Sequence, residues 1–200
     1  MAPSLHYVTL TGAAIEQVFD DLAHLRISVF RDYPYLYEGD VSYEKNYLKT
    51  YARSERSLLF AVYDGNKMVG ATTCIPLADE TGEIQMPFQN AGLDLDSIFY
   101  FGESILLPHF RGIGLGHRFF DEREKHAASF QTYKLTCFCA VDRGNVHPAK
   151  PANYRANDTF WLKRGYRKDN TLQSQMEWPD LGEDHPTPKT MIFWTRPLIN

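Results

Sequence analysis

Apolar positions near the N-terminus change from strand-like to helical spacing. Residues 5–10 are rich in β-forming side chains and predict a short first strand. From Ile15 to Val29, apolar residues recur at intervals of three and four, which predicts an amphipathic helix. The helix should end near Tyr33, because Pro34 disfavours helical conformations in the residue before it.

A second helix and a hairpin follow this first unit. The helix is expected to begin after Ser42, whose hydroxyl can cap its N-terminus. Residues 57–63 and 67–75 are rich in β-formers and are separated by Asp-Gly-Asn at 64–66, which predicts a β-hairpin. The predicted helix places on one face the four residues Tyr43, Tyr47, Leu48 and Tyr51.

The C-terminal half alternates strands with helices. The patterns predict strands over 99–107, 135–141 and 191–195, and helices over 115–129 and 158–164. Gly165 follows the last helix as a C-terminal cap. The alternation predicts an α/β (α+β) protein with its sheet on the inside, in a single domain spanning residues 1–200.

Composition narrows the class of protein. The chain is 44% apolar and 23% charged, as in ordinary globular proteins, and its apolar runs are far shorter than the ~20 residues that cross a bilayer. No basic start followed by an apolar run is visible, so no secretory signal and no membrane partner are expected. We therefore expect a cytoplasmic protein.

Charge and cysteine content exclude further classes. The net charge of −4 argues against a nucleic-acid partner and is compatible with an amine substrate. Cys137 and Cys139 lie two apart on a predicted strand, a poor geometry for a disulfide, so with Cys74 they are expected to be buried thiols in a reducing compartment. No spacing typical of a metal site accompanies them, and we expect no metal.

A glycine-rich turn carries the main chemical signal. Gly112, Gly114 and Gly116 alternate between a predicted strand and the start of a predicted helix. Glycines there let a ligand approach the backbone, and the free N–H groups of a helix start favour an anion. The spacing fits neither the dinucleotide G-x-G-x-x-G nor the phosphate loop ending in Lys-Ser or Lys-Thr. A turn that serves only tight packing is the alternative.

This segment resembles the signature Q/R-x-x-G-x-G/A of the GNAT superfamily of acyl-CoA N-acyltransferases. Residues 111–116, Arg-Gly-Ile-Gly-Leu-Gly, satisfy every position, and Leu-Leu-Pro-His-Phe at 106–110 resembles the run that precedes the family's glycines. Asn153, followed by Trp161 and Gly165-Tyr166, resembles the family's N-x₇-Y-x₃-G-F ending, with tryptophan in place of the tyrosine.

The resemblance implies a fold and a cofactor site. The fold would be a mixed, mostly antiparallel sheet of six to seven strands with about four flanking helices, in which two central strands splay into a V-shaped cleft. Acetyl-CoA would be the co-substrate, and relatives often dimerise through edge strands. The residues that would bind acetyl-CoA are Leu106, Leu107, Arg111, Gly112, Gly114, Gly116, His117 and Asn153.

The resemblance also implies direct transfer of an acetyl group to a neutral amine. Glu103, on the strand before the glycines, is the candidate general base, and a salt-bridging or solvent-facing carboxylate is the alternative. Because an indole cannot act as an acid at neutral pH, Trp161 cannot protonate the leaving thiolate. Either Tyr154 does so or the thiolate leaves without a dedicated acid.

The acceptor side would come from the loop between the first two helices. Tyr33, Tyr37 and Glu38 place aromatic faces beside a carboxylate, which suits an organic ammonium. A surface loop anchored by aromatic residues is the other interpretation. We expect N-acetylation of the primary amine of a small, metabolite-like acceptor; a non-catalytic acyl-CoA sensor and a protein or peptide N-acetyltransferase are the alternatives.

Overall fold

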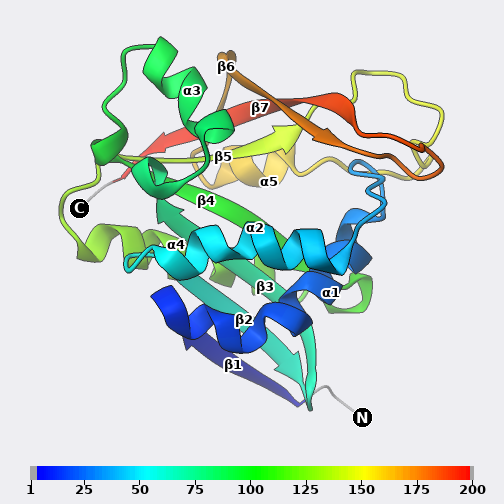
Figure 1. Cartoon of the computed structure of the whole chain (residues 1–200), viewed down its shortest axis with the longest axis horizontal. Helices are drawn as coiled ribbons and strands as arrows, with labels where there is room; N and C mark the ends of the chain where they lie inside the picture. Colours follow the sequence, from blue (N-terminus) through cyan, green and yellow to red (C-terminus); the bar gives the residue numbers. More distant parts are fainter. Residues whose placement is uncertain (1–3, 199–200) are drawn as a thin grey trace.

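The computed structural model describes residues 4–198 and contains one seven-stranded sheet. The order of strands is β1-β2-β3-β4-β5-β7-β6, and only β4 and β5 run parallel (Figure 1). The strands are β1 (Leu5–Leu10), β2 (Leu58–Asp64), β3 (Lys67–Pro76), β4 (Ile98–Leu106), β5 (Leu135–Val141), β6 (Arg167–Trp178) and β7 (Thr187–Pro197).

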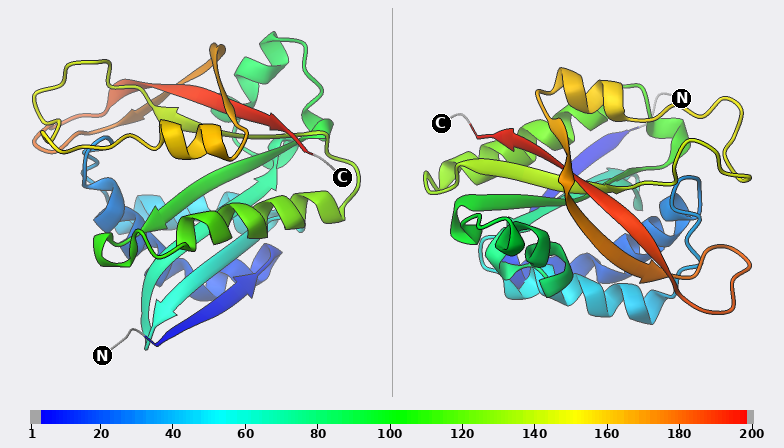
Figure 2. Two further views of the ribbon diagram at one scale, coloured as in Figure 1. Left: turned by 180° about the vertical axis from the view of Figure 1, so that it is seen from behind. Right: turned by 90° about the horizontal axis from the view of Figure 1, so that it is seen from above.

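Helices cover both faces of this sheet. In Figure 1, α1, α2 and α3 lie in front, and the view from behind in Figure 2 brings α4 and α5 forward. The helices are α1 (Phe19–Phe30), α2 (Val41–Arg53), α3 (Gly82–Asn90), α4 (Leu115–Ser129) and α5 (Asp158–Lys163); a 3-10 helix over Gly12–Val18 precedes α1. The mixed, mostly antiparallel sheet and its helical layers confirm the predicted fold class.

Most predicted elements are present, and the differences have local causes. The hairpin β2–β3 and the strands β1 and β5 form as predicted. The cap of α2 is Asp40, not Ser42: the Asp40 carboxylate accepts a hydrogen bond from the Tyr43 N–H at 2.8 Å. The predicted cap after α5 is correct, because Gly165 has a φ of 88° that suits glycine.

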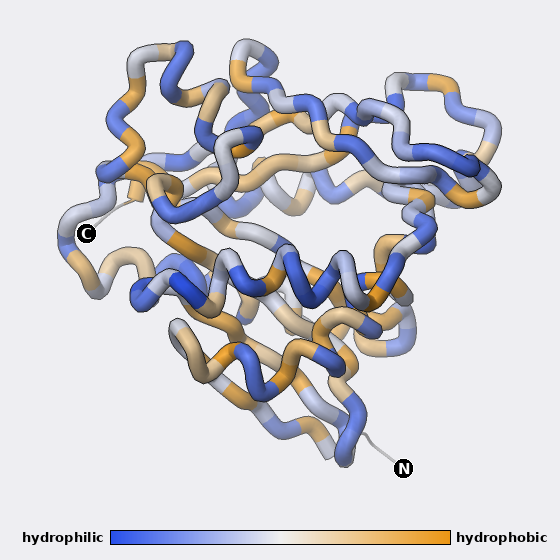
Figure 3. Tube along the Cα trace, in the orientation of Figure 1, coloured by the Kyte–Doolittle hydropathy of each residue, from blue (hydrophilic) through white to orange (hydrophobic). Residues whose placement is uncertain are grey.

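The two faces of the sheet bury separate apolar cores. Under α1 and α2 the core includes Ile15, Leu22 and Leu48, whereas under α4 and α5 it is mainly aromatic. In Figure 3, α2 alternates between hydrophobic and hydrophilic colours, as a helix with one buried face should. The aromatic core includes Phe99, Phe101, Phe120, Phe138, Tyr166 and Trp194.

Candidate active site

The central strands β4 and β5 separate along their length. They pair only over three positions, the last of which joins Tyr100 to Cys137. Beyond that pair β4 continues to Leu106 while β5 stays bound to β7 as far as Val141. A cleft of about 460 Å³ lies at this separation and is lined from both faces of the sheet. The predicted V-shaped opening between central strands is therefore present.

A bulge in β4 gives Glu103 its orientation. The register between β3 and β4 shifts so that Gly102 and Glu103 together lie opposite Thr73. The Glu103 N–H donates to the Thr73 hydroxyl at 3.3 Å, and the Thr72 hydroxyl donates to the Glu103 carbonyl at 2.8 Å. Because an extra residue changes which face the following side chains occupy, this bulge determines where the carboxylate points.

Glu103 is a buried carboxylate with one unpartnered oxygen. It lines the cleft and is 4% exposed. One oxygen forms an ion pair with Arg26 of α1, which also pairs with the buried Glu44 of α2, and the other oxygen, Oε1, has no hydrogen-bond partner. Burial raises the pKa of the Glu103 carboxyl above its ordinary value, the Arg26 charge opposes this rise, and Glu44 adds to it.

Sequence reasoning missed Arg26 and Glu44, although both carried a signal. Arg26 occurs among the apolar positions of the first helix, and Glu44 occurs next to Tyr43 and one turn before Leu48. Charged residues on a core-facing stripe need a partner, because an unpaired buried charge is costly. The guanidinium of Arg26 also lies over the rings of Phe30 and Tyr47, at 5.0 and 4.6 Å from their centroids.

The glycine turn lies at the surface where β4 leads into α4. Gly112 and Gly114 have φ values of 79° and 92°, which other residues rarely adopt, and a Cβ at either position would meet nothing within 4 Å. The first hydrogen bond of α4 runs from the Arg118 N–H to the Gly114 carbonyl at 3.2 Å. The N–H groups of residues 115–117 therefore have no hydrogen-bond acceptor within the helix, as an anion site requires.

The remaining glycine-turn residues have individual environments. Gly116 has no positive φ, and a Cβ there would meet only the Phe160 ring, at 3.6 Å. His117 is exposed and packs edge-on against Phe160, with ring centroids 4.9 Å apart. Arg111 is exposed and its Nε donates to the Leu106 carbonyl at 3.0 Å. The residues present thus fit a pyrophosphate over the turn.

Backbone pairing distinguishes Leu106 from Leu107. The Leu107 N–H donates to the Val69 carbonyl at 2.9 Å, so it is committed to β3. Antiparallel pairing alternates, and Leu106 is opposite Gly70, so the Leu106 N–H points away from β3 into the separation from β5. Of these two backbone N–H groups, the one at Leu107 is thus engaged by β3 and the one at Leu106 is directed toward the cleft; cofactor binding by Leu106 and Leu107 stays a prediction.

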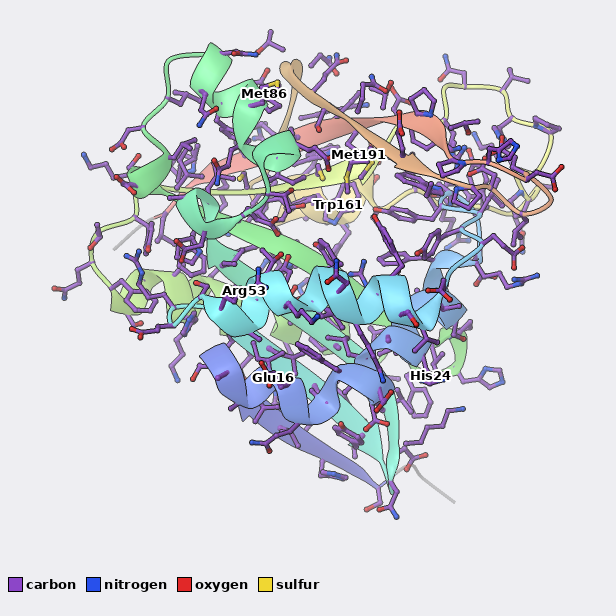
Figure 4. All side chains as sticks on the ribbon, viewed as in Figure 1. Glu16, His24, Arg53, Met86, Trp161 and Met191 are labelled. Carbon is purple, nitrogen blue, oxygen red and sulfur yellow. The ribbon has the colours of Figure 1, made fainter. Side chains whose placement is uncertain are left out.

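Tyr154 and Trp161 both line the cleft. Tyr154 packs edge-on against Tyr33, with centroids 4.7 Å apart, and burial raises the pKa of its hydroxyl. Trp161 packs against Phe138 and Trp194 at 5.0 and 5.1 Å. Figure 4 labels Trp161 and shows it between α2 and the β7 strand in that view. Asn153 is exposed on the loop before α5 and is not among the residues that line the cleft.

Two loops meet at the acceptor end of the cleft. Tyr33 and Tyr37 line it as predicted, but Glu38 does not: its side chain is exposed and pairs with Arg31 at 3.0 Å. Arg143 ties the α1–α2 loop to the β6–β7 loop. It donates to the Pro34 carbonyl at 2.7 Å and forms a two-pronged ion pair with Asp180 at 2.7 and 2.8 Å.

The two thiols of β5, of which Cys139 lines the cleft, are unreactive because of their surroundings. Burial raises the pKa of Cys139 to about 12, and its sulfur lies 3.3 Å from the Tyr100 hydroxyl. Cys137 is fully buried and burial raises its pKa as well. Since a thiolate is the nucleophilic form, neither cysteine is suited to covalent catalysis. All three cysteines are free.

Comparison with known proteins identifies the fold. No protein-family model and no curated protein sequence matches this chain. Among solved structures, an acetyltransferase of the GNAT family from Streptococcus pneumoniae is 10% identical, with a TM-score of 0.59, over 98% of this chain and 100% of that one. The chain has the GNAT fold. The resemblance inferred from the glycine turn is thereby confirmed at the level of structure.

Two further solved structures with this fold are acetyltransferases from other organisms. Ribosomal-protein-alanine N-acetyltransferase from Brucella melitensis is 11% identical, with a TM-score of 0.60, over 96% of this chain and 99% of that one. NAA60 from Arabidopsis thaliana, solved with a bisubstrate analogue, is 12% identical, with a TM-score of 0.59, over 98% and 100%. At these identities the likeness concerns the fold.

The described residues contain neither a membrane-spanning helix nor a cluster of metal ligands. Within residues 4–198, no helix combines the length and apolar character needed to cross a membrane. In the same part of the chain, no group of three or more histidine, cysteine or acidic side chains is placed to hold a metal ion.

Proposed function

We propose that the protein is an acyl-CoA-dependent N-acyltransferase. It would transfer the acetyl group of acetyl-CoA to the primary amine of a small acceptor. The observation that carries this proposal is Glu103, a buried carboxylate with a free oxygen in the cleft between β4 and β5. The glycine turn supports it, because it offers an anion site at the start of α4, beside the end of β4.

The chain's own residues supply binding, orientation and proton transfer. Acetyl-CoA, when bound, supplies an activated acyl group. The backbone at residues 112–117 holds phosphate, and the Leu106 N–H donates to the carbonyl oxygen that gains negative charge during transfer. Glu103 takes a proton from the attacking ammonium or amine, a role that suits a carboxyl whose pKa burial raises above its ordinary value.

Tyr154 is the proposed acid for the departing thiolate. Its hydroxyl stays protonated because burial raises its pKa, and its ring is held at the cleft by Tyr33. The inert thiols of Cys137 and Cys139 favour direct transfer between the bound substrates over an acyl-enzyme. Trp161 contributes packing to the cleft wall.

A small acceptor fits the closed end of the cleft. The α1–α2 and β6–β7 loops are joined by Arg143, by the Glu38 N–H to the Pro179 carbonyl at 3.0 Å, and by the Leu181 N–H to the Leu36 carbonyl at 2.7 Å. An extended peptide leaving the cleft between these loops would have to break those hydrogen bonds. Tyr33, Tyr37 and Tyr43 present aromatic surface to an organic ammonium at this end.

A protein N-terminus is the second candidate acceptor. It is favoured by the shared fold with the ribosomal-protein-alanine N-acetyltransferase from Brucella melitensis. The joined loops argue against it. Release of CoA thiol from acetyl-CoA should be measured with amines, polyamines, amino acids and short peptides, beside calorimetric titration of CoA.

The outcomes of that assay distinguish three hypotheses: a small acceptor, a protein N-terminus as acceptor, and a non-catalytic sensor. Amine-dependent release with small acceptors and none with peptides is expected. Release only with peptides would replace the small acceptor by a protein N-terminus. Binding of CoA without release by any acceptor would contradict the enzyme and support a non-catalytic acyl-CoA sensor.

A further inference from the structure

Arg123 of α4 is a buried arginine without an acidic partner. It is 2% exposed, and its guanidinium lies over the rings of Phe101 and Phe120, 4.4 and 4.5 Å from their centroids. Its Nε donates to the Phe119 carbonyl at 3.2 Å. No carboxylate in residues 4–198 forms an ion pair with it.

The other arginines in comparable surroundings are paired. Arg26 meets Glu44 and Glu103, Arg143 meets Asp180, and Arg164 meets Asp121 and Glu124. Arg164 also lies over the Phe120 ring, at 5.4 Å. Arg123 therefore differs from its neighbour Arg164 in lacking an acid, not in its aromatic contact.

An unpaired buried guanidinium is costly unless an anion reaches it. Arginine stays charged at neutral pH, although burial lowers the pKa of Arg123 from its very high ordinary value. Burying a charge without a partner opposes folding, so such groups are normally paired or face a ligand. The planar guanidinium offers parallel N–H donors that match a carboxylate.

The position of Arg123 indicates where the anion arrives. It lines the cleft together with Phe120 and Phe138, which belong to the aromatic core under α4, whereas Glu103 meets Arg26 of α1, which also pairs with Glu44 of α2. The helix that carries Arg123 is also the one whose N-terminus follows the glycine turn. Arg123 thus lies on the side of the sheet where the acyl donor is proposed to bind.

We propose that Arg123 forms a carboxylate-binding subsite in the cleft, and that its place on α4 assigns the carboxylate to the acyl group. The preferred donor would then be a CoA thioester of a dicarboxylic acid, such as succinyl-CoA or malonyl-CoA. This inference rests on the proposed acyltransferase function and specifies its donor.

The chemistry of transfer is unchanged by such a donor. The amine nitrogen forms a bond to the thioester carbon and the carbon–sulfur bond breaks. The sulfur leaves with its electron pair and is protonated to the free CoA thiol, while the amine loses one proton. The terminal carboxylate of the acyl group takes no part and remains bound as an anion.

Succinyl-CoA and butyryl-CoA form a matched pair for the test, because their acyl chains have the same number of carbon atoms and differ in the terminal carboxylate. For the wild-type protein we expect succinyl-CoA to exceed butyryl-CoA about 10- to 100-fold in kcat/KM, the range for charged hydrogen bonds. Calorimetric titration without acceptor should show the same order of Kd. Malonyl- against propionyl-CoA extends the comparison to a shorter chain.

Variants assign the preference to Arg123. Arg123→Met should abolish the preference for succinyl-CoA, and Arg164→Met, which removes a neighbouring arginine on the same ring, should retain it. Because the wild-type comparison needs no variant, it tests the predicted preference for a dicarboxylic donor even if Arg123→Met fails to fold. Arg123→Gln offers a second variant with hydrogen-bond donors and no charge.

The second arm of the experiment concerns the acceptor. Amino acids and their amides are compared with acetyl-CoA as donor, in the wild type and in Arg123→Met. If the wild type prefers amino acids to their amides and Arg123→Met does not, the subsite is supported, but its carboxylate belongs to the acceptor and not to the acyl group. Equal use of charged and neutral partners in both arms would overturn the subsite, although the acceptor-dependent release of CoA thiol in those arms would still support the acyltransferase. Failure of every acyl-CoA to bind would overturn both proposals.

Discussion

Arg26 and Glu103 form an ion pair that joins α1 to the bulged strand β4 at the cleft, and Arg26 shares its charge with the buried Glu44. One guanidinium thus stabilises two carboxylates that would otherwise repel each other in a desolvated space. The pair fixes one Glu103 oxygen and leaves the other in the cleft. This arrangement determines the effect expected for each change around it.

Glu103→Gln should lower kcat/KM by about 100- to 10,000-fold, the usual contribution of a positioned base. CoA affinity should stay unchanged, because the glycine turn is untouched. Glu80→Gln is the matched control: Glu80 is also buried with a raised pKa, but it does not line the cleft. Equal losses in the two variants would show that a buried charge, and not a base, had been measured.

The pH dependence of activity should follow Glu103. Since the base must be deprotonated, kcat/KM should rise with pH through a pKa above that of an ordinary glutamate. The acidic limb should be absent in Glu103→Gln. An unchanged acidic limb in that variant would assign the titration to another group or to the acceptor.

Arg26→Met should lower the free energy of unfolding at pH 7 by about 3–5 kcal/mol, because two buried carboxylates lose their cation. The pKa of Glu103 should rise further, so the folded state should bind its proton more tightly than the unfolded state does. The deficit against wild type should therefore shrink as pH falls toward about 5 and grow as pH rises through that pKa. Urea unfolding at both pH values measures it, and a deficit independent of pH would contradict the electrostatic cause.

Gly114→Ala should weaken CoA binding about tenfold while leaving the core intact. Alanine at the φ of 92° found there is strained by about 1–2 kcal/mol, and the turn should shift to relieve it. Gly92→Ala is the control, since Gly92 also has a positive φ, 70°, and a Cβ there would meet nothing within 4 Å, but it follows α3 and does not line the cleft. Calorimetry with CoA compares the two, and equal affinities would remove the turn from the binding site.

Arg143→Met should separate the α1–α2 and β6–β7 loops. It removes hydrogen bonds to the Pro34 and Tyr35 carbonyls and the ion pair with Asp180, all largely shielded from water. We expect a loss of about 3–5 kcal/mol in stability, faster amide exchange over residues 33–40 and new activity toward short peptides. Arg31→Met removes only an exposed ion pair and should change none of these.

The regular elements and the glycine turn were readable from the sequence because their signals are local. The strand over Leu135–Val141 and the hairpin at 64–66 depend on side chains next to one another. The helix α3 gave no such signal, since it contains Pro87. The strand β6 is an edge strand with mostly exposed polar residues, so it lacks a clear apolar alternation.

The site was only partly predictable because its key relationships are long-range. Glu103 follows from the resemblance, but the face it occupies depends on the bulge opposite Thr73, which depends on pairing between strands. Glu38 was expected at the cleft and instead pairs with Arg31. Arg26 and Arg123 are charges on core-facing positions, a pattern that marks a residue as unusual without naming its partner.

The separation of β4 from β5 gives the sheet two internal edges in addition to its outer edges at β1 and β6. Unpaired strand edges normally invite association with other chains. Here the internal pair of edges opens into the cleft, whereas the outer edges at β1 and β6 lie at the two ends of the sheet. An extended ligand with amide groups that enters the gap adds to the sheet as a strand would. Because such a ligand binds the folded chain and not the unfolded one, its binding raises the free energy of unfolding.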